Sequence, residues 1–151
     1  MMYHTHLAFG LLFGLLSLSF VHPSNKFVFI AIVVLSALLP DADHKNSKIN
    51  SKIPGLKIVS RIFGHRGLLH SIWIPLALWL IIDFGFHSTY GSAVFIGYLS
   101  HLFSDGLTKA GINMVHPLKQ LRIQGFIETG SVLEHLIFLF VSVLCVILVL
   151  S

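Results

Sequence analysis

The sequence predicts an all-α membrane protein, a polytopic membrane helix bundle of about five helices. Hydrophobic residues make up 55% of the 151 residues and charged residues only 11%, whereas a soluble domain carries about 25% charged residues. The mean hydropathy is +0.86, and the apolar residues are gathered into runs. A buried soluble helix bundle is the alternative, but it would lack the polar surface needed to cover it. We therefore expect residues 1–151 to form a single integral membrane domain, since this length suits one domain.

Five apolar runs account for the expected membrane spans, with limits of about 5–22, 27–40, 68–86, 91–108 and 131–150. A helix needs about 20 apolar residues to cross the hydrocarbon core, and only the third and fifth runs approach that length easily. The other runs are short, so we expect their polar ends to be drawn into the membrane boundary. Pro40 ends the second run, and Pro75 predicts a kink in the third.

The basic residues are distributed unevenly among the connecting loops. Most of them lie in loops 41–67 and 109–130, whereas the two loops on the opposite side hold only Lys26 between them. The positive-inside rule therefore places the N-terminus and both basic loops in the cytoplasm and the C-terminus outside. The sequence thus predicts a multi-pass protein of the inner (cytoplasmic) membrane.

The segment Lys45–Arg66 combines basic residues with apolar residues at roughly helical spacing. This pattern predicts an interfacial amphipathic loop segment that contacts anionic lipid. An ordinary solvated basic loop is the alternative. No nucleic-acid partner is expected, because the segment has neither an aromatic platform nor a known nucleic-acid motif.

Histidine and carboxylate residues lie at the same end of several apolar runs. In antiparallel helices these ends meet at one face of the membrane, where ionisable groups are costly unless they have a function. Imidazole mixed with carboxylate favours Zn as the metal, with Mn or Fe as alternatives. The sequence therefore predicts a site for one or two divalent ions. Its candidate ligands are His6, Asp41, Asp43, His65, His70, His101 and Asp105.

Each of these motifs alone also has a purely structural interpretation. His101 and Asp105 are spaced i and i+4 on one helix face, which suits one metal ion but also suits interhelical hydrogen bonding. Asp41 and Asp43 follow a helix C-terminus, which repels carboxylates and so favours a neighbouring cation. A turn with a solvated aspartate is the alternative there. If two ions bind, Asp41 or Asp43 is expected to bridge them.

Three residues are candidates for catalysis. His70 is the expected general acid or base, and Arg66 is placed to grip a phosphate group. Glu134 is a weaker candidate, because it also fits a capping box with Ser131 at the start of the last helix. Ser71 and Ser104 are expected to orient ligands of the metal site.

Four motifs stand out along nearly the whole chain: Thr5-His6 with Gly10, Leu39-Pro40-Asp41-Ala42-Asp43, His65-Arg66-Gly67 with His70-Ser71, and Gly97-Tyr98 with His101, Asp105, Thr108 and Gly111. Together they resemble the YdjM-like family of predicted inner-membrane metal-dependent hydrolases. The resemblance implies a metal site and hydrolase activity. An association with the SOS repressor LexA is also implied, because it is attached to the name of one family member.

We accordingly expect a membrane-embedded metal-dependent hydrolase with its site at the cytoplasmic membrane boundary. Metal-activated water would be the nucleophile, and a lipid or phosphoester the substrate. One alternative is a metal-stapled interaction protein without catalysis, with LexA or anionic lipid as partner. A metal transporter is less favoured, because only Asp83 and His87 lie toward the opposite face. The sequence leaves the oligomeric state open.

Overall fold

The computed structural model describes residues 1–41, 68–86, 88–118 and 121–150. Three predicted site residues, Asp43, His65 and Arg66, lie outside the described residues, as does the expected amphipathic segment. The helical elements are α1 (Tyr3–Ser17), α2 (Lys26–Ser36), the 3₁₀ turns η1 (Leu39–Asp41) and η2 (Leu68–His70), α4 (Trp73–Gly85), α5 (Tyr90–Gly106) and α6 (Val132–Leu150). Two short strands, β1 (Ile112–Asn113) and β2 (Arg122–Ile123), pair in an antiparallel ladder.

The five helices follow the five apolar runs of the sequence, and the fold is mostly helical as expected. The strand pair β1–β2 is a small departure from an all-α fold, in the loop between α5 and α6. Pro75 was expected to kink the third apolar run, but in the structure it lies near the start of a single helix. Pro75 is the third residue of α4, in the first turn, where a backbone N–H has no intrahelical partner, so the helix accommodates proline there without breaking.

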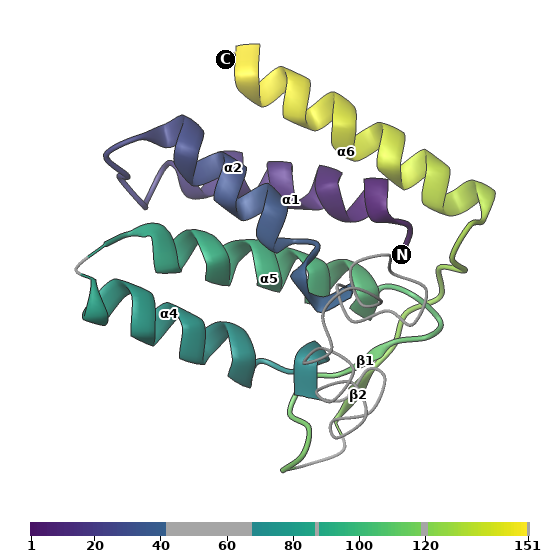
Figure 1. Cartoon of the computed structure of the whole chain (residues 1–151). Coiled ribbons are helices and arrows are strands. Elements are labelled where there is room, and N and C mark those ends of the chain that lie inside the picture. Colours follow the sequence, from purple (N-terminus) through teal and green to yellow (C-terminus); the bar gives the residue numbers. More distant parts are fainter. Residues whose placement is uncertain (42–67, 87, 119–120, 151) are drawn as a thin grey trace, which may run out of the picture.

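Helix α5 is the centre of the bundle and packs against α1, α2 and α4, while α6 packs mainly against α1 (Figure 1). Successive helices alternate in direction, so the start of α1, the end of α2, the start of α4, the end of α5 and the start of α6 lie at one end of the molecule (Figure 1). This is the end at which the sequence gathers its histidines and carboxylates. We call it the polar end.

Glycines allow α1 and α5 to approach α2 closely. A Cβ atom added at Gly97 of α5 would lie 2.1 Å from the carbonyl oxygen of Val33, and one at Gly10 of α1 would lie 2.9 Å from Cβ of Ala37. Only glycine fits at such distances. The packing of both helices therefore fixes the position of the last turn of α2, which leads directly into η1.

At the opposite end of the bundle, Asp83 of α4 caps the start of α5. Its Oδ1 accepts hydrogen bonds from the backbone N–H groups of Gly91 (2.8 Å) and Ser92 (3.2 Å), and its Oδ2 accepts one from the Ser92 hydroxyl (2.6 Å). A carboxylate is favoured beside free N–H groups at a helix N-terminus. The hydrogen bonds of Asp83 therefore serve to cap α5, far from the polar end.

The connection from α5 to α6 is held against the end of α5. The backbone N–H of Lys109 donates to the carbonyl of Ile127 at 2.8 Å, and the N–H of Ile127 donates to Leu107 at 3.1 Å. A Cβ at Gly125 would lie 2.2 Å from the Leu107 carbonyl oxygen, and Gly111 has φ of +63°. Both glycines are therefore required by close backbone packing and a left-handed turn.

Among the described helices, α6 is the one with the length and apolar composition to cross a membrane, and α4 is a shorter apolar helix. Much of α6 faces outward as an apolar surface, with Leu139 59% exposed, Phe140 64% and Ile147 56%. An apolar surface of this extent marks a lipid or partner contact. The other four helices are shorter than the length of about 20 residues that a membrane span needs.

Candidate metal centre

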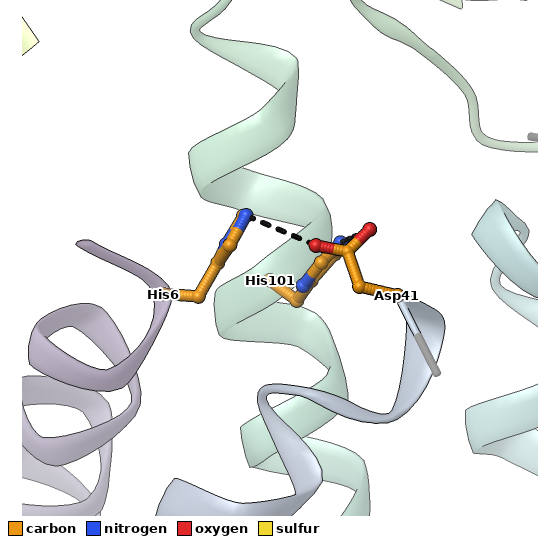
Figure 2. A group of neighbouring side chains, drawn as sticks. All are labelled: His6, Asp41 and His101. Atoms are coloured by element: carbon orange, nitrogen blue, oxygen red, sulfur yellow. Dashed lines mark ion pairs between the residues drawn. The ribbon is translucent and has the colours of Figure 1, made fainter. Parts of the chain in front are cut away.

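Three imidazoles and two carboxylates converge at the polar end of the bundle. His6 comes from the first turns of α1, Asp41 from η1, and His70 from η2. His101 and Asp105 come from the last turns of α5. Figure 2 shows His6, Asp41 and His101 pointing toward one another from three separate elements. Each Nε2 atom lies 3.5–4.0 Å from an oxygen of each carboxylate.

His6 is held by a hydrogen bond that defines its tautomer. Its Nδ1 lies 2.8 Å from the Ser104 hydroxyl oxygen. That hydroxyl already donates its own proton to the His101 carbonyl at 2.9 Å, so it accepts from His6. Nδ1 of His6 therefore carries the proton, and the lone pair is on Nε2, the atom facing the two carboxylates.

His101 is held in the same tautomer by a different partner. Its Nδ1 lies 2.8 Å from the Ala37 carbonyl oxygen, which only accepts hydrogen bonds. Nδ1 therefore carries the proton, and the Nε2 lone pair faces Asp41 and Asp105. The backbone between α2 and η1 thus orients a side chain of α5, the arrangement by which proteins usually fix metal-binding histidines.

His70 enters the cluster from η2. The Tyr98 hydroxyl donates to the neighbouring Leu69 carbonyl, and the N–H of Ile72 donates to the Met114 carbonyl at 3.0 Å, so η2 is fixed on both sides. Nε2 of His70 lies 3.7 Å from Asp41 and 4.0 Å from Asp105. Within the described residues, neither ring nitrogen of His70 has a hydrogen-bond partner.

The two carboxylates differ in exposure. The Asp41 side chain is 38% exposed and the Asp105 side chain 4%. Burial alone would raise the pKa of Asp41, whereas positive charge on its neighbours His70, His101 and His6 would lower it from 3.8 to about 2. With the Nε2 lone pairs facing the carboxylate, a bound cation would have to supply that positive charge. One oxygen of Asp105 also accepts from the Met1 ammonium group.

The donor set fits a divalent transition metal. Across the described chain, the Nε2 atoms of His6, His70 and His101 are buried without a hydrogen-bond partner. Buried polar atoms normally have partners, and a metal ion would supply one for these three. The nitrogen–oxygen distances of 3.5–4.0 Å are too long for good hydrogen bonds. They are close to the separation of about 3.3–3.4 Å between neighbouring ligands around a tetrahedral zinc ion.

The structure thus brings together five of the predicted ligands, namely His6, Asp41, His70, His101 and Asp105. Glu134 is placed differently. It is buried, and its oxygens accept from the backbone N–H groups of Met2 and Gly130, both at 2.7 Å. The Ser131 hydroxyl accepts from the Glu134 N–H at 3.3 Å, as the capping interpretation expects. A catalytic role for Glu134 stays a prediction.

Sequence reasoning named Ser104 as an orienting residue but did not find Ala37. Every residue has a backbone carbonyl, so the residue type does not indicate which carbonyl binds a side chain. Only the geometry of the α2–η1 connection reveals that the Ala37 carbonyl holds His101. Ser71, which follows His70 in the chain, is buried. Its role stays a prediction.

Comparison with known proteins identifies relatives over most of the chain. An uncharacterised protein, YvsG, of Bacillus subtilis is 38% identical over 111 residues, which cover 68% of this chain and 66% of the relative. The inner membrane protein YdjM of Escherichia coli is 33% identical over 113 residues, which cover 69% of this chain and 58% of the relative. The chain therefore matches about three fifths to two thirds of the length of these relatives.

No solved structure matches the chain significantly. The family model described as YdjM inner membrane protein matches residues 1–151. This match extends over every element that builds the centre, from α1 to the end of α5. The chain belongs to the YdjM family of inner membrane proteins.

Proposed function

We propose that this protein is a membrane-embedded metal-dependent hydrolase whose site lies at the cytoplasmic membrane boundary. The observation that carries the proposal is the set of three buried Nε2 atoms without partners in the described chain, facing two carboxylates. A purely structural cluster would be expected to satisfy these atoms with hydrogen bonds. Zn is the preferred metal, with Mn or Fe as alternatives, because imidazole is mixed with carboxylate.

A divalent ion bound here would supply Lewis acidity, which polarises an ester or phosphoester and activates water at neutral pH. The protein's own part is to keep the imidazoles deprotonated at Nε2 and oriented. The Ser104 hydroxyl and the Ala37 carbonyl do this for His6 and His101. Asp41 is the partly exposed carboxylate of the cluster, and a substrate would approach along its edge.

A lipid or phosphoester is the proposed substrate. The outward faces of the helices are apolar, which suits contact with lipid, and the cluster lies at one end of the bundle. The proposed cytoplasmic orientation rests on the basic loops of the sequence. Arg66 is the proposed phosphate-binding residue, by its charge and its place in the chain close to His70.

His70 has two candidate roles, as a metal ligand and as the general acid or base. It differs from the other two imidazoles because neither ring nitrogen has a hydrogen-bond partner in the described chain. The two roles predict different defects. Replacing a ligand removes metal, whereas replacing a proton carrier lowers turnover and leaves the metal in place.

The hydrolase proposal is tested with detergent-purified protein loaded with Zn²⁺ or Mn²⁺. The substrates are a soluble phosphodiester, a soluble phosphomonoester and vesicles of anionic phospholipid. We expect hydrolysis of at least one class by the parent protein and loss of it in folded Asp105→Asn. His135→Ala is the matched control, because His135 is exposed on α6 with its ring bonded to the Ser131 carbonyl. A metal-loaded parent protein that hydrolyses none of these substrates contradicts the proposal.

A metal-stapled interaction protein is the second candidate, with anionic lipid or LexA as the proposed partner. It is favoured by the origin of the ligands in four separate elements, α1, η1, η2 and α5, because a shared ion would tie these together. The distinguishing result is a large fall in thermal stability on chelation without any substrate turnover. A metal transporter is less favoured. Asp83, which lies toward the opposite face, is engaged in capping α5.

A further inference from the structure

We propose that the centre holds two metal ions, bridged by both Asp41 and Asp105, with unequal protein ligand sets. One position, the single-histidine position, takes His6 with Oδ2 of Asp41 and with Oδ1 of Asp105, the oxygen that the Met1 ammonium group contacts in this structure and that the ion would take over. The other, the two-histidine position, takes His70 and His101 with Oδ1 of Asp41 and Oδ2 of Asp105. This inference rests on the proposed metal-dependent function and specifies the number of ions and the ligands of each.

The first argument is the way in which the carboxylate oxygens are shared. His6 Nε2 approaches Oδ2 of Asp41 at 3.7 Å and Oδ1 of Asp105 at 3.5 Å. His101 Nε2 approaches the opposite oxygens, at 3.9 and 3.6 Å. In Figure 2 the two oxygens of Asp41 are turned toward different imidazoles. Each carboxylate therefore presents one oxygen to each side, which is how a bridging ligand binds.

His70 falls on the same side as His101. Its Nε2 lies 3.7 Å from Oδ1 of Asp41 and 4.0 Å from Oδ2 of Asp105, the two oxygens that His101 approaches. The donors therefore divide into two groups by geometry alone. This division gives His70 the ligand role rather than that of a free acid or base.

The second argument is the stacking of His6 and His101. Their rings are nearly parallel, with 14° between the planes and 3.9 Å between the centroids. An imidazole lone pair lies in the plane of its ring, so nearly parallel stacked rings direct their lone pairs to different points. A single ion would have to lie well out of at least one ring plane. The separation instead suits two ions about 3.5–4 Å apart, as in known two-metal sites.

His101 lies close enough to both His6 and His70 to belong to either ligand group. One lone pair on Nε2 allows it to bind only one ion, and its nearest oxygens place it with His70. Among the described residues, the two-histidine position then has four protein donors and the single-histidine position three. We therefore expect the two-histidine position to bind its ion more tightly, and the single-histidine position to leave more coordination sites for water or substrate.

The test is a titration of folded, metal-stripped protein with Mn²⁺, followed by equilibrium metal content and electron paramagnetic resonance. The parent protein is expected to bind two ions per chain in a tight and a weak phase, with the signature of magnetically coupled Mn²⁺ at saturation. Folded His6→Ala should lose the weak phase and the coupling and keep the tight ion. Folded His70→Ala should weaken the tight phase on the order of 10–100-fold or more.

His135→Ala is the control and should match the parent, because His135 is exposed and bonded to Ser131. A single ion per chain at saturation, or two ions without coupling, overturns the proposal. Loss of all metal from folded His6→Ala also overturns it. If that variant does not fold, the parent spectrum alone decides. These readouts do not depend on turnover, so two coupled ions without hydrolysis would contradict the hydrolase and leave the two-ion centre standing.

Discussion

Ser104 joins two histidines of the centre through one hydroxyl group. It accepts from His6 Nδ1 at 2.8 Å and donates to the His101 carbonyl at 2.9 Å. The Ser104 side chain is fully buried, so bulk water does not compete for these two hydrogen bonds. This one residue therefore defines which nitrogen of His6 carries the proton.

Ser104→Ala is expected to weaken metal binding on the order of 10–100-fold, because His6 loses the partner that orients it. Isothermal titration with Zn²⁺ measures the affinity directly. Ser142→Ala is the matched control, since the Ser142 hydroxyl donates to the Phe138 carbonyl of its own helix at 2.8 Å. Equal affinity in the parent and folded Ser104→Ala would remove Ser104 from the centre.

At the scale of single elements, the contact between α5 and α2 leaves no room for a side chain at Gly97. Gly97→Ala is expected to destabilise the protein by about 1–3 kcal/mol, because the two helices must move apart. It should also weaken metal binding, since Ala37 at the end of α2 holds His101. Thermal unfolding in detergent followed by circular dichroism, together with metal titration, measures both effects.

Gly85→Ala is the control for that substitution, because a Cβ at Gly85 would meet nothing within 4 Å. The two substitutions add the same methyl group to helices of the same bundle. A Gly97→Ala protein as stable as Gly85→Ala would show that α2 and α5 are not held at this distance.

The cap of α5 provides a prediction at the opposite end of the molecule. Asp83→Ala should cost about 0.5–2 kcal/mol of stability, because the N–H groups of Gly91 and Ser92 lose their acceptor. Metal content should stay unchanged, which elemental analysis of the folded variant measures. Asp83→Asn keeps an acceptor oxygen and should recover part of the stability. Metal loss in both variants would instead connect Asp83 with the centre.

The sequence predicted the elements better than it predicted their contacts. Apolar runs and polar ends located all five described helices and five candidate ligands that the structure brings together, because burial and charge leave periodic signals in residue type. The starting position of α4 was harder to predict, since proline is compatible with the first turn of a helix and also with a kink inside one. The pair β1–β2 is only two residues long in each strand and gives no recognisable alternation.

Within the centre, the unpredicted features are those that depend on backbone geometry. Asp41 or Asp43 was expected to bridge two ions, and the spacing of His101 and Asp105 suggested only a pair on one helix. In the structure Asp105 lies as close to His6 of α1 as to His101 of its own helix, at 3.5 and 3.6 Å. That distance between helices is determined by the glycine contacts, which sequence spacing does not report.

At the scale of the whole molecule, the alternation of helix directions predicts where the two ends of α6 lie. If the polar end faces the cytoplasm, a reporter fused after Leu150 should read as periplasmic, because α6 runs away from that end (Figure 1). A fusion within loop 109–130 is the control and should read as cytoplasmic. A cytoplasmic signal from the C-terminal fusion would contradict the orientation on which the substrate proposal depends.

The unequal exposure of the ligands has a consequence for inhibition. The Asp41 side chain is 38% exposed, whereas those of His6, His70, His101 and Asp105 are at most 4% exposed. If the centre holds metal as proposed, a chelator would meet the described part of the centre first at Asp41, because the other four side chains are buried. We would then expect a small chelator to remove the metal faster than a bulky one of equal affinity, since the bulky one would need the bundle to open.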